Sequence, residues 1–106
     1  MPVTLYHRTP RQNLRSILRR GLQARCEACV GENEGRKGVY LWRFLAAAEG
    51  RPFGGRRRLR GNVVIAVTIP DPALCLLSRD NEYFEDETEA YVYPTDIPPT
   101  WIEEIK

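Results

Sequence analysis

The chain has 106 residues, of which 42% are hydrophobic and 28% are charged, the balance of a soluble globular protein with one core of its own. No apolar run approaches the roughly 18 residues that a membrane span requires, and the N-terminus lacks the features of a signal peptide. The sequence therefore predicts a cytoplasmic protein with no membrane association. Its three cysteines, an odd number, argue against a disulfide framework and fit a reducing compartment.

Positive and negative charges are segregated along the chain, although the net charge is only +2. Residues 1–60 carry fourteen Lys or Arg against four acids, whereas residues 61–106 carry two basic residues against ten acids. Such segregation is typical of a basic surface for a polyanion, such as a nucleic acid or a dinucleotide. It is equally typical of two halves that neutralise each other in the fold.

The N-terminal segment predicts a strand followed by a helix. Residues 3–7 alternate in polarity and end at His7, the only histidine. Thr9 is expected to cap the helix, with Pro10 at its first position and Gly21 at its end. One apolar stripe follows helical spacing and comprises Leu14, Ile17, Leu18 and Leu22.

The remaining elements are short and mostly extended. The sequence predicts a strand at 38–42, a short helix at 44–49, an apolar interior strand at 62–69 and a strand or extended segment at 74–77. Residues 89–93 alternate, so that 89, 91 and 93 share one face of a strand. Pro98 and Pro99 are expected to exclude a helix before a last short strand at 101–102. These elements predict one α+β domain over residues 1–106, with a mainly antiparallel sheet and one or two helices.

Three residues that could carry chemistry lie on separate predicted strands, namely His7, Tyr40 and Glu89. Each taken singly has an ordinary structural explanation. A lone histidine at a strand end is most often structural, a strand tyrosine is most often a core or edge aromatic, and a glutamate in an acidic stretch is most often solvated. Their order along the chain and their positions beside turns make them candidates for one site.

Several motifs resemble the ADP-ribosyltransferase fold of the His–Tyr–Glu clade. "LYHRT" leads into "NLRSILRRGL", "GVYL" leads into a short helix, and "EAYVYPTDIPPTWI" closes the chain. The resemblance covers residues 4–49 and 62–102 in the family's order. It implies a small split, mainly antiparallel sheet core and an enzyme that transfers ADP-ribose from NAD to a macromolecular acceptor, with a nucleic acid as one candidate.

The same resemblance assigns roles to individual residues. Glu89 is implied to be the catalytic carboxylate, which accepts a hydrogen bond from the ribose 2′-hydroxyl and stabilises an oxocarbenium-like transition state. Tyr40 is implied to stack on the nicotinamide ring, and His7 to bind a ribose hydroxyl. The implied NAD contacts are His7, Arg8, Thr9, Tyr40 and Arg15, with Arg8, Arg11 or Arg15 as candidates for the pyrophosphate.

The chain departs from the family pattern at two positions and leaves alternatives open. Arg8 follows His7 where relatives often carry Gly, and Trp42 follows "VYL" where Ser or Thr is common. Glu85 or Glu87 would replace Glu89 if the strand register shifted. The second reading of the same scaffold is an NAD-dependent RNA 2′-phosphotransferase, which the "TDIPPTWI" end resembles but which typically carries a second histidine.

Two readings without catalysis also remain: a nucleotide- or nucleic-acid-binding module of the same fold, and an interaction domain for a protein partner. Small stand-alone transferases of this kind often act as toxins or defence effectors, so the resemblance also implies a neutralising antitoxin as a partner.

Three further motifs carry less weight. Cys26 and Cys29 form a C-x-x-C, but zinc would need two more ligands and only Cys75 and His7 remain, so no metal site is predicted. The arginine run at 56–60 is either a nucleic-acid contact or a solvated loop tip. The acidic stretch at 80–88 is expected to be an exposed loop beside Glu89.

Overall fold

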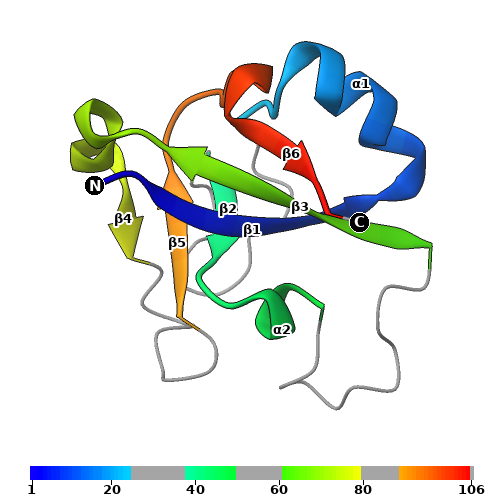
Figure 1. Cartoon of the computed structure of the whole chain (residues 1–106), viewed down its shortest axis with the longest axis horizontal. Helices are drawn as coiled ribbons and strands as arrows, with labels where there is room; N and C mark the ends of the chain where they lie inside the picture. Colours follow the sequence, from blue (N-terminus) through cyan, green and yellow to red (C-terminus); the bar gives the residue numbers. More distant parts are fainter. Residues whose placement is uncertain (25–37, 50–60, 80–88, 106) are drawn as a thin grey trace.

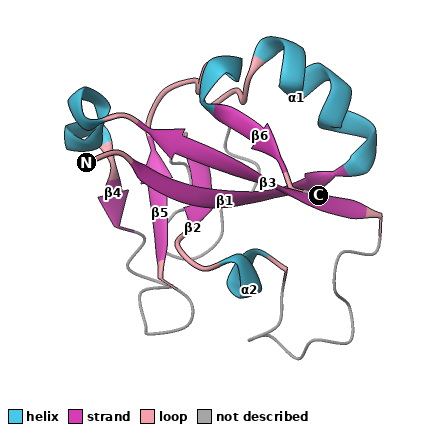
Figure 2. Ribbon diagram, in the orientation of Figure 1, coloured by secondary structure: helices cyan, strands magenta, loops and turns pink. Residues whose placement is uncertain are grey.

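A computed structural model describes residues 1–24, 38–49, 61–79 and 89–105 of the chain. These residues form one six-stranded antiparallel sheet with few helices, in the strand order β4-β5-β2-β1-β3-β6 (Figure 1 and Figure 2). The strands are β1 (Val3–Pro10), β2 (Val39–Trp42), β3 (Asn62–Ile69), β4 (Ser78–Arg79), β5 (Ala90–Tyr93) and β6 (Ile102–Glu104). The helices are α1 (Leu14–Arg20) and α2 (Leu45–Ala48), with short 3-10 turns at η1 (Arg11–Asn13), η4 (Asp71–Leu76) and η6 (Pro99–Trp101). The predicted α+β class with an antiparallel sheet is confirmed.

The sheet consists of two groups of strands that meet at the pair β1–β2. β1 pairs with β3 over its whole length, from Val3↔Ile69 to Pro10↔Asn62, whereas its register with β2 is limited to Tyr6↔Trp42. Figure 1 shows β1 and β3 running roughly horizontally, while β2, β4 and β5 run roughly vertically. The strands therefore diverge beyond Tyr6, and the sheet changes direction at this place.

The main core fills the face of the sheet that α1 and η6 cover. Leu5, Leu41 and Ile65 are fully buried there, one from each of β1, β2 and β3. Ile17 of α1 and Ile97 join the same cluster. The opposite face is covered by α2, which packs against β1 and β2 and buries Ala47 and Ala48.

The structure corrects the predicted start of the first helix. β1 continues through Thr9 and Pro10, which pair with Val63 and Asn62, so Thr9 is a buried strand residue and not a helix cap. Ladder pairing with the long strand β3 outweighs the local capping signal. The α-helix starts only at Leu14.

The apolar stripe of this helix is partly confirmed. Ile17 and Leu22 are buried and Leu14 packs against the core, but Leu18 is exposed. Gly21 ends the helix as predicted, with a positive φ of 86° and its N–H donating to the Ile17 carbonyl at 2.7 Å.

Two predictions in the second half of the chain are wrong. Residues 74–77, expected to be extended, lie mostly in the 3-10 turn η4, and the following strand β4 is two residues long. Pro98 and Pro99 do not exclude a helical turn, because Pro99 occupies the first turn of η6, where a missing N–H costs nothing. The strands at 62–69 and 90–93 agree with the predictions.

Candidate functional site

The three predicted catalytic positions come from neighbouring strands of the sheet. Glu89 directly precedes β5, Tyr40 lies in β2 and His7 lies in β1, and these strands are adjacent in the order β5-β2-β1. The chain order of the strands does not show this adjacency, since β3 and β4 intervene between β2 and β5.

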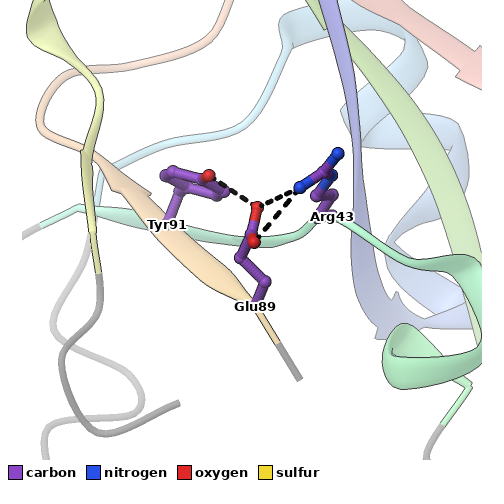
Figure 3. Close-up of polar contacts among 3 residues, drawn as sticks. All are labelled: Arg43, Glu89 and Tyr91. Carbon is purple, nitrogen blue, oxygen red and sulfur yellow. Dashed lines mark hydrogen bonds and ion pairs between the residues drawn. The ribbon is translucent and has the colours of Figure 1, made fainter. Parts of the chain in front are cut away.

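Glu89 is held by two side chains at the end of β5 (Figure 3). The Arg43 guanidinium donates from Nη1 to Oε1 at 3.2 Å and to Oε2 at 3.1 Å. The Tyr91 hydroxyl donates to Oε2 at 2.7 Å. The backbone fixes the same pair, because the Arg43 N–H donates to the Glu89 carbonyl at 2.9 Å. The carboxylate is thus oriented from two sides, and the Glu89 side chain is only 14% exposed.

These partners keep Glu89 ionised. The hydrogen bond from Tyr91 lowers the pKa of the Glu89 carboxyl below its usual value of 4.5, and the hydrogen bond and positive charge of Arg43 and the charge of Arg79 lower it further, against partial desolvation. Partial burial and the neighbouring carboxylate raise the pKa of the Tyr91 phenol above 10.0. At neutral pH the cluster is therefore a carboxylate, a guanidinium and a neutral phenol.

The carboxylate of Glu89 keeps acceptor capacity for a further donor. A carboxylate offers about four lone-pair sites, and the contacts from Arg43 and Tyr91 use three of them. Oε1 accepts only from Arg43 among these contacts, so it is the oxygen that can accept from a ligand hydroxyl.

His7 is anchored where the sheet changes direction. Its Nδ1 lies 2.9 Å from the Tyr40 carbonyl oxygen of the neighbouring strand. Because a carbonyl only accepts, Nδ1 must carry the proton, and in the neutral ring Nε2 is then an acceptor. The contact fixes both the orientation and the tautomer of the imidazole.

The Tyr40 side chain lies on the other face of the sheet from Glu89. Tyr40 pairs with Val92 and Leu41 pairs with Tyr91, and directly opposite residues of an antiparallel pair share a face. Tyr91, which touches Glu89, thus lies on the face of Leu41. The structure brings His7 to the backbone of Tyr40, while the aromatic ring beside Glu89 belongs to Tyr91.

β2 links the two halves of the site. Tyr40 accepts from His7, and Arg43, three positions further along, donates to Glu89. At about 3.3 Å per residue, an extended backbone covers about 10 Å from residue 40 to residue 43. This span is comparable with a nucleoside-sized group.

The other predicted NAD contacts are spread over the molecule. Thr9 is 5% exposed, which leaves little of its side chain open to a ligand. Arg8 directly follows His7 in β1, so its side chain lies on the opposite face of the sheet, the face of Tyr6 and Trp42. Arg15 is exposed on α1.

Two residues of the cluster were absent from the predicted site, Arg43 and Tyr91. The alternation of residues 89, 91 and 93 was the available signal for Tyr91, since it places that ring beside Glu89. Arg43 follows the "GVYLW" strand directly, but nothing in the sequence indicates that β2 lies beside β5.

Several predicted features lie outside the described residues, namely Cys26, Cys29, the arginine run at 56–60 and the whole acidic stretch at 80–88 with Glu85 and Glu87. Within the described part of the chain, no group of three His, Cys, Asp or Glu could hold a metal ion, and no helix is long and apolar enough to cross a membrane. The chain matches no protein-family model and no curated protein sequence.

Proposed function

We propose that the chain is an NAD-dependent ADP-ribosyltransferase with Glu89 as its catalytic carboxylate. One observation carries the proposal: an ionised, doubly oriented carboxylate with a remaining acceptor site lies at the end of a strand, and the next strand but one presents an anchored histidine. The motifs that resemble the His–Tyr–Glu clade assign the catalytic carboxylate to Glu89 and a ribose contact to His7.

The chemistry requires a fixed negative charge. When the bond between nicotinamide and ribose C1′ breaks, both bonding electrons leave with the nicotinamide nitrogen and positive charge develops on the ribose. Glu89 accepts a hydrogen bond from the 2′-hydroxyl and stabilises that charge, and an acceptor nucleophile then bonds to C1′ and releases its proton. The lowered pKa of Glu89 suits this role, because the carboxylate acts as an anion and not as an acid.

The neighbouring groups fit the rest of the dinucleotide. His7 is the residue to which the resemblance assigns a ribose hydroxyl, and the contact of its Nδ1 with the Tyr40 carbonyl oxygen orients the ring. Arg43 uses Nη1 on Glu89, and its side chain is 56% exposed, so its other N–H groups can reach a pyrophosphate oxygen. For the nicotinamide ring, Tyr40 is the aromatic that the resemblance implies, and Tyr91 is the aromatic on the face of Glu89.

The test is release of nicotinamide and transfer of label from NAD labelled in the adenine ring, with DNA, RNA and protein as acceptors. Glu89→Gln should lower the rate by about 10²–10³-fold, while the circular dichroism spectrum stays that of the folded wild type. Glu103→Gln, an exposed glutamate on β6, is the matched control and should be active. Absence of both nicotinamide release and label transfer with every acceptor contradicts the proposal.

The same experiment distinguishes an ADP-ribosyltransferase from an RNA 2′-phosphotransferase. An RNA 2′-phosphotransferase would consume NAD only with RNA that carries a 2′-phosphate, and the product would be dephosphorylated RNA. Stable labelled adducts on unphosphorylated acceptors support the ADP-ribosyltransferase.

A further inference from the structure

The helix α1 and the preceding turn η1 carry an exposed row of arginines. Its members are Arg11, Arg15, Arg19 and Arg20. All four are exposed, and η1 and α1 contain no acidic residue. None of the four forms an ion pair or hydrogen bond through its side chain with another residue of the described chain. We call this row the α1 arginine surface.

The row has no evident structural purpose in the fold. Like charges four residues apart on a helix destabilise it by a few tenths of a kcal/mol per pair, and Arg11→Arg15→Arg19 contains two such spacings. The helix dipole favours the cations at the C-terminal end, Arg19 and Arg20, but not those at the N-terminal end, Arg11 and Arg15. Packing of α1 uses the other side of the helix, through Leu14 and Ile17.

We propose that the α1 arginine surface binds the phosphate backbone of a nucleic acid. We further infer that this nucleic acid is the acceptor of ADP-ribose, and that part of the inference rests on the proposed function. Residues 11 to 19 span about 12 Å at 1.5 Å per residue, which corresponds to three or four phosphates at 3.4 Å of rise each. The row is therefore long enough to contact several consecutive phosphates of one nucleic-acid strand.

The choice of side chain also favours phosphate. All four positions are arginine, whose planar guanidinium binds phosphate oxygens through two parallel N–H groups, whereas lysine offers a point charge. Arginines spaced by one helical turn can each reach a separate phosphate. Contacts to phosphate oxygens carry no sequence information, so this contribution to binding should depend little on sequence.

The test is a titration of a fluorescein-labelled 20-nucleotide single strand, as DNA and as RNA, followed by anisotropy between 50 and 200 mM NaCl and without NAD. The variant Arg15→Gln/Arg19→Gln should bind about tenfold more weakly at the higher salt. The slope of log K against log salt should fall by about 1.4, which is 0.7 for each phosphate that the variant no longer neutralises. Arg15→Lys/Arg19→Lys should retain most of the slope.

A matched control separates a local effect from a change of net charge. Pro72→Glu/Leu76→Glu also changes the charge by −2, at exposed positions of η4, which lies at the opposite end of the molecule from α1 in Figure 1. This variant should keep wild-type binding. An equal loss in both variants, or no binding of either oligonucleotide by the wild type at 50 mM NaCl, overturns the proposal.

Two further outcomes distinguish a failure of the nucleic-acid proposal from a failure of the proposed enzymatic function. If polyglutamate of equal charge displaces the oligonucleotide as well as unlabelled DNA does, the surface recognises acidic polypeptides and the nucleic-acid assignment is wrong. Because the titration uses no NAD, it tests the surface even if the protein transfers no ADP-ribose. Conversely, if label is transferred only to protein while the oligonucleotide still binds, the α1 arginine surface is confirmed as a nucleic-acid-binding surface. Its role in presenting the acceptor of ADP-ribose is then wrong.

Discussion

Arg43 and Glu89 lie opposite each other at the ends of β2 and β5, joined both by their backbones and by their side chains. The backbone N–H of Arg43 donates to the Glu89 carbonyl at 2.9 Å, and Nη1 of the same residue lies 3.1 Å from Oε2. The guanidinium carbon also lies 5.3 Å from the centre of the Phe44 ring, within the range of a cation–π contact. The carboxylate is therefore oriented by a cation that is itself held on two sides.

Removal of the Arg43 guanidinium should impair the reaction more than the fold. Arg43→Gln removes a hydrogen bond and a positive charge from Glu89, so the pKa of that carboxyl should rise. A half-exposed ion pair contributes at most about 1 kcal/mol to stability, but a misplaced carboxylate costs about 10–10²-fold in rate. The measurements are nicotinamide release, the urea midpoint and the pKa of Glu89 from ¹³C NMR.

Arg79→Gln is the control for this variant. Arg79 acts on Glu89 through its charge alone, so the rise of the Glu89 pKa should be smaller and the rate should change little. If the two variants affect the rate equally, the contribution of Arg43 is general electrostatics and not orientation.

Tyr91→Phe should test the second support of the carboxylate. The variant keeps the ring, which packs against the core, and removes only the hydroxyl that donates to Oε2 at 2.7 Å. A hydrogen bond of this kind contributes about 1–2 kcal/mol, so the unfolding free energy should fall by about that amount and the pKa of Glu89 should rise. Unchanged values of both would show that the contact does not form in solution.

Stability should fall on the acid side of about pH 4.5 through Glu89. The folded-state pKa of this carboxyl lies below its unfolded value of 4.5, so its contribution is present in full above that pH and is lost as the pH falls through the folded-state pKa. Tyr91 has the opposite sign, because its pKa is raised above 10.0, and its contribution is lost only as the pH rises through that higher value.

The measurement is the urea midpoint from pH 2 to pH 8 for the wild type and Glu89→Gln. The difference between the two proteins should be constant from pH 6 to pH 8 and should shrink below pH 4.5. A difference that grows on acidification contradicts the lowered pKa.

His7 should act through both ring nitrogens, and the two roles can be separated. His7→Asn can place an amide N–H near the position of Nδ1 and so retain the bond to the Tyr40 carbonyl, but it lacks Nε2. We expect stability within about 1 kcal/mol of the wild type together with an increased KM for NAD. His7→Ala should lose both stability and activity, and an Asn variant with wild-type kinetics would leave His7 a purely structural role.

The sequence predicted those parts of the molecule that depend on local pattern. The alternation at 89–93 places Glu89 and Tyr91 on one face, and the apolar run at 62–69 forms β3. The neighbour relations were not predictable in this way, because β5 pairs with β2 across a long stretch of chain. Arg43 meets Glu89 only through that pairing, so no local signal identifies it.

Local signals failed where a distant partner competed with them. Thr9 and Pro10 resemble a helix start, yet eight residues of β1 pair with β3 and carry both into the strand. Leu18 follows the helical stripe, but α1 is short and contacts the core through Ile17, which leaves Leu18 39% exposed. In both cases the tertiary contacts available to the segment decide the outcome, not its intrinsic propensity.

Gly21 should be the position where the smallest substitution has a large effect on the fold. Its φ of 86° and ψ of −174° fall in a region that only glycine adopts readily, at a cost of order 1–3 kcal/mol for other residues. A Cβ atom at this position would also collide with the Ile97 carbonyl oxygen. That carbonyl accepts from the Leu22 N–H at 2.9 Å, and the Ile97 N–H donates back to Leu22 at 2.8 Å.

Gly61→Ala is a matched control for Gly21→Ala. Gly61 has nearly the same φ, 84°, but a Cβ atom there would meet no atom of the described residues within 4 Å. In both variants the strained backbone conformation should lower the unfolding free energy by about 1 kcal/mol or more. Only Gly21→Ala should also disrupt the Leu22–Ile97 bridge. We therefore expect Gly21→Ala to lower the unfolding free energy by at least about 2 kcal/mol more than Gly61→Ala, since displacement of two buried backbone hydrogen bonds adds roughly 1 kcal/mol each. Equal losses in urea denaturation would mean that Ile97 moves aside at no cost and that the bridge does not anchor the C-terminal segment to α1.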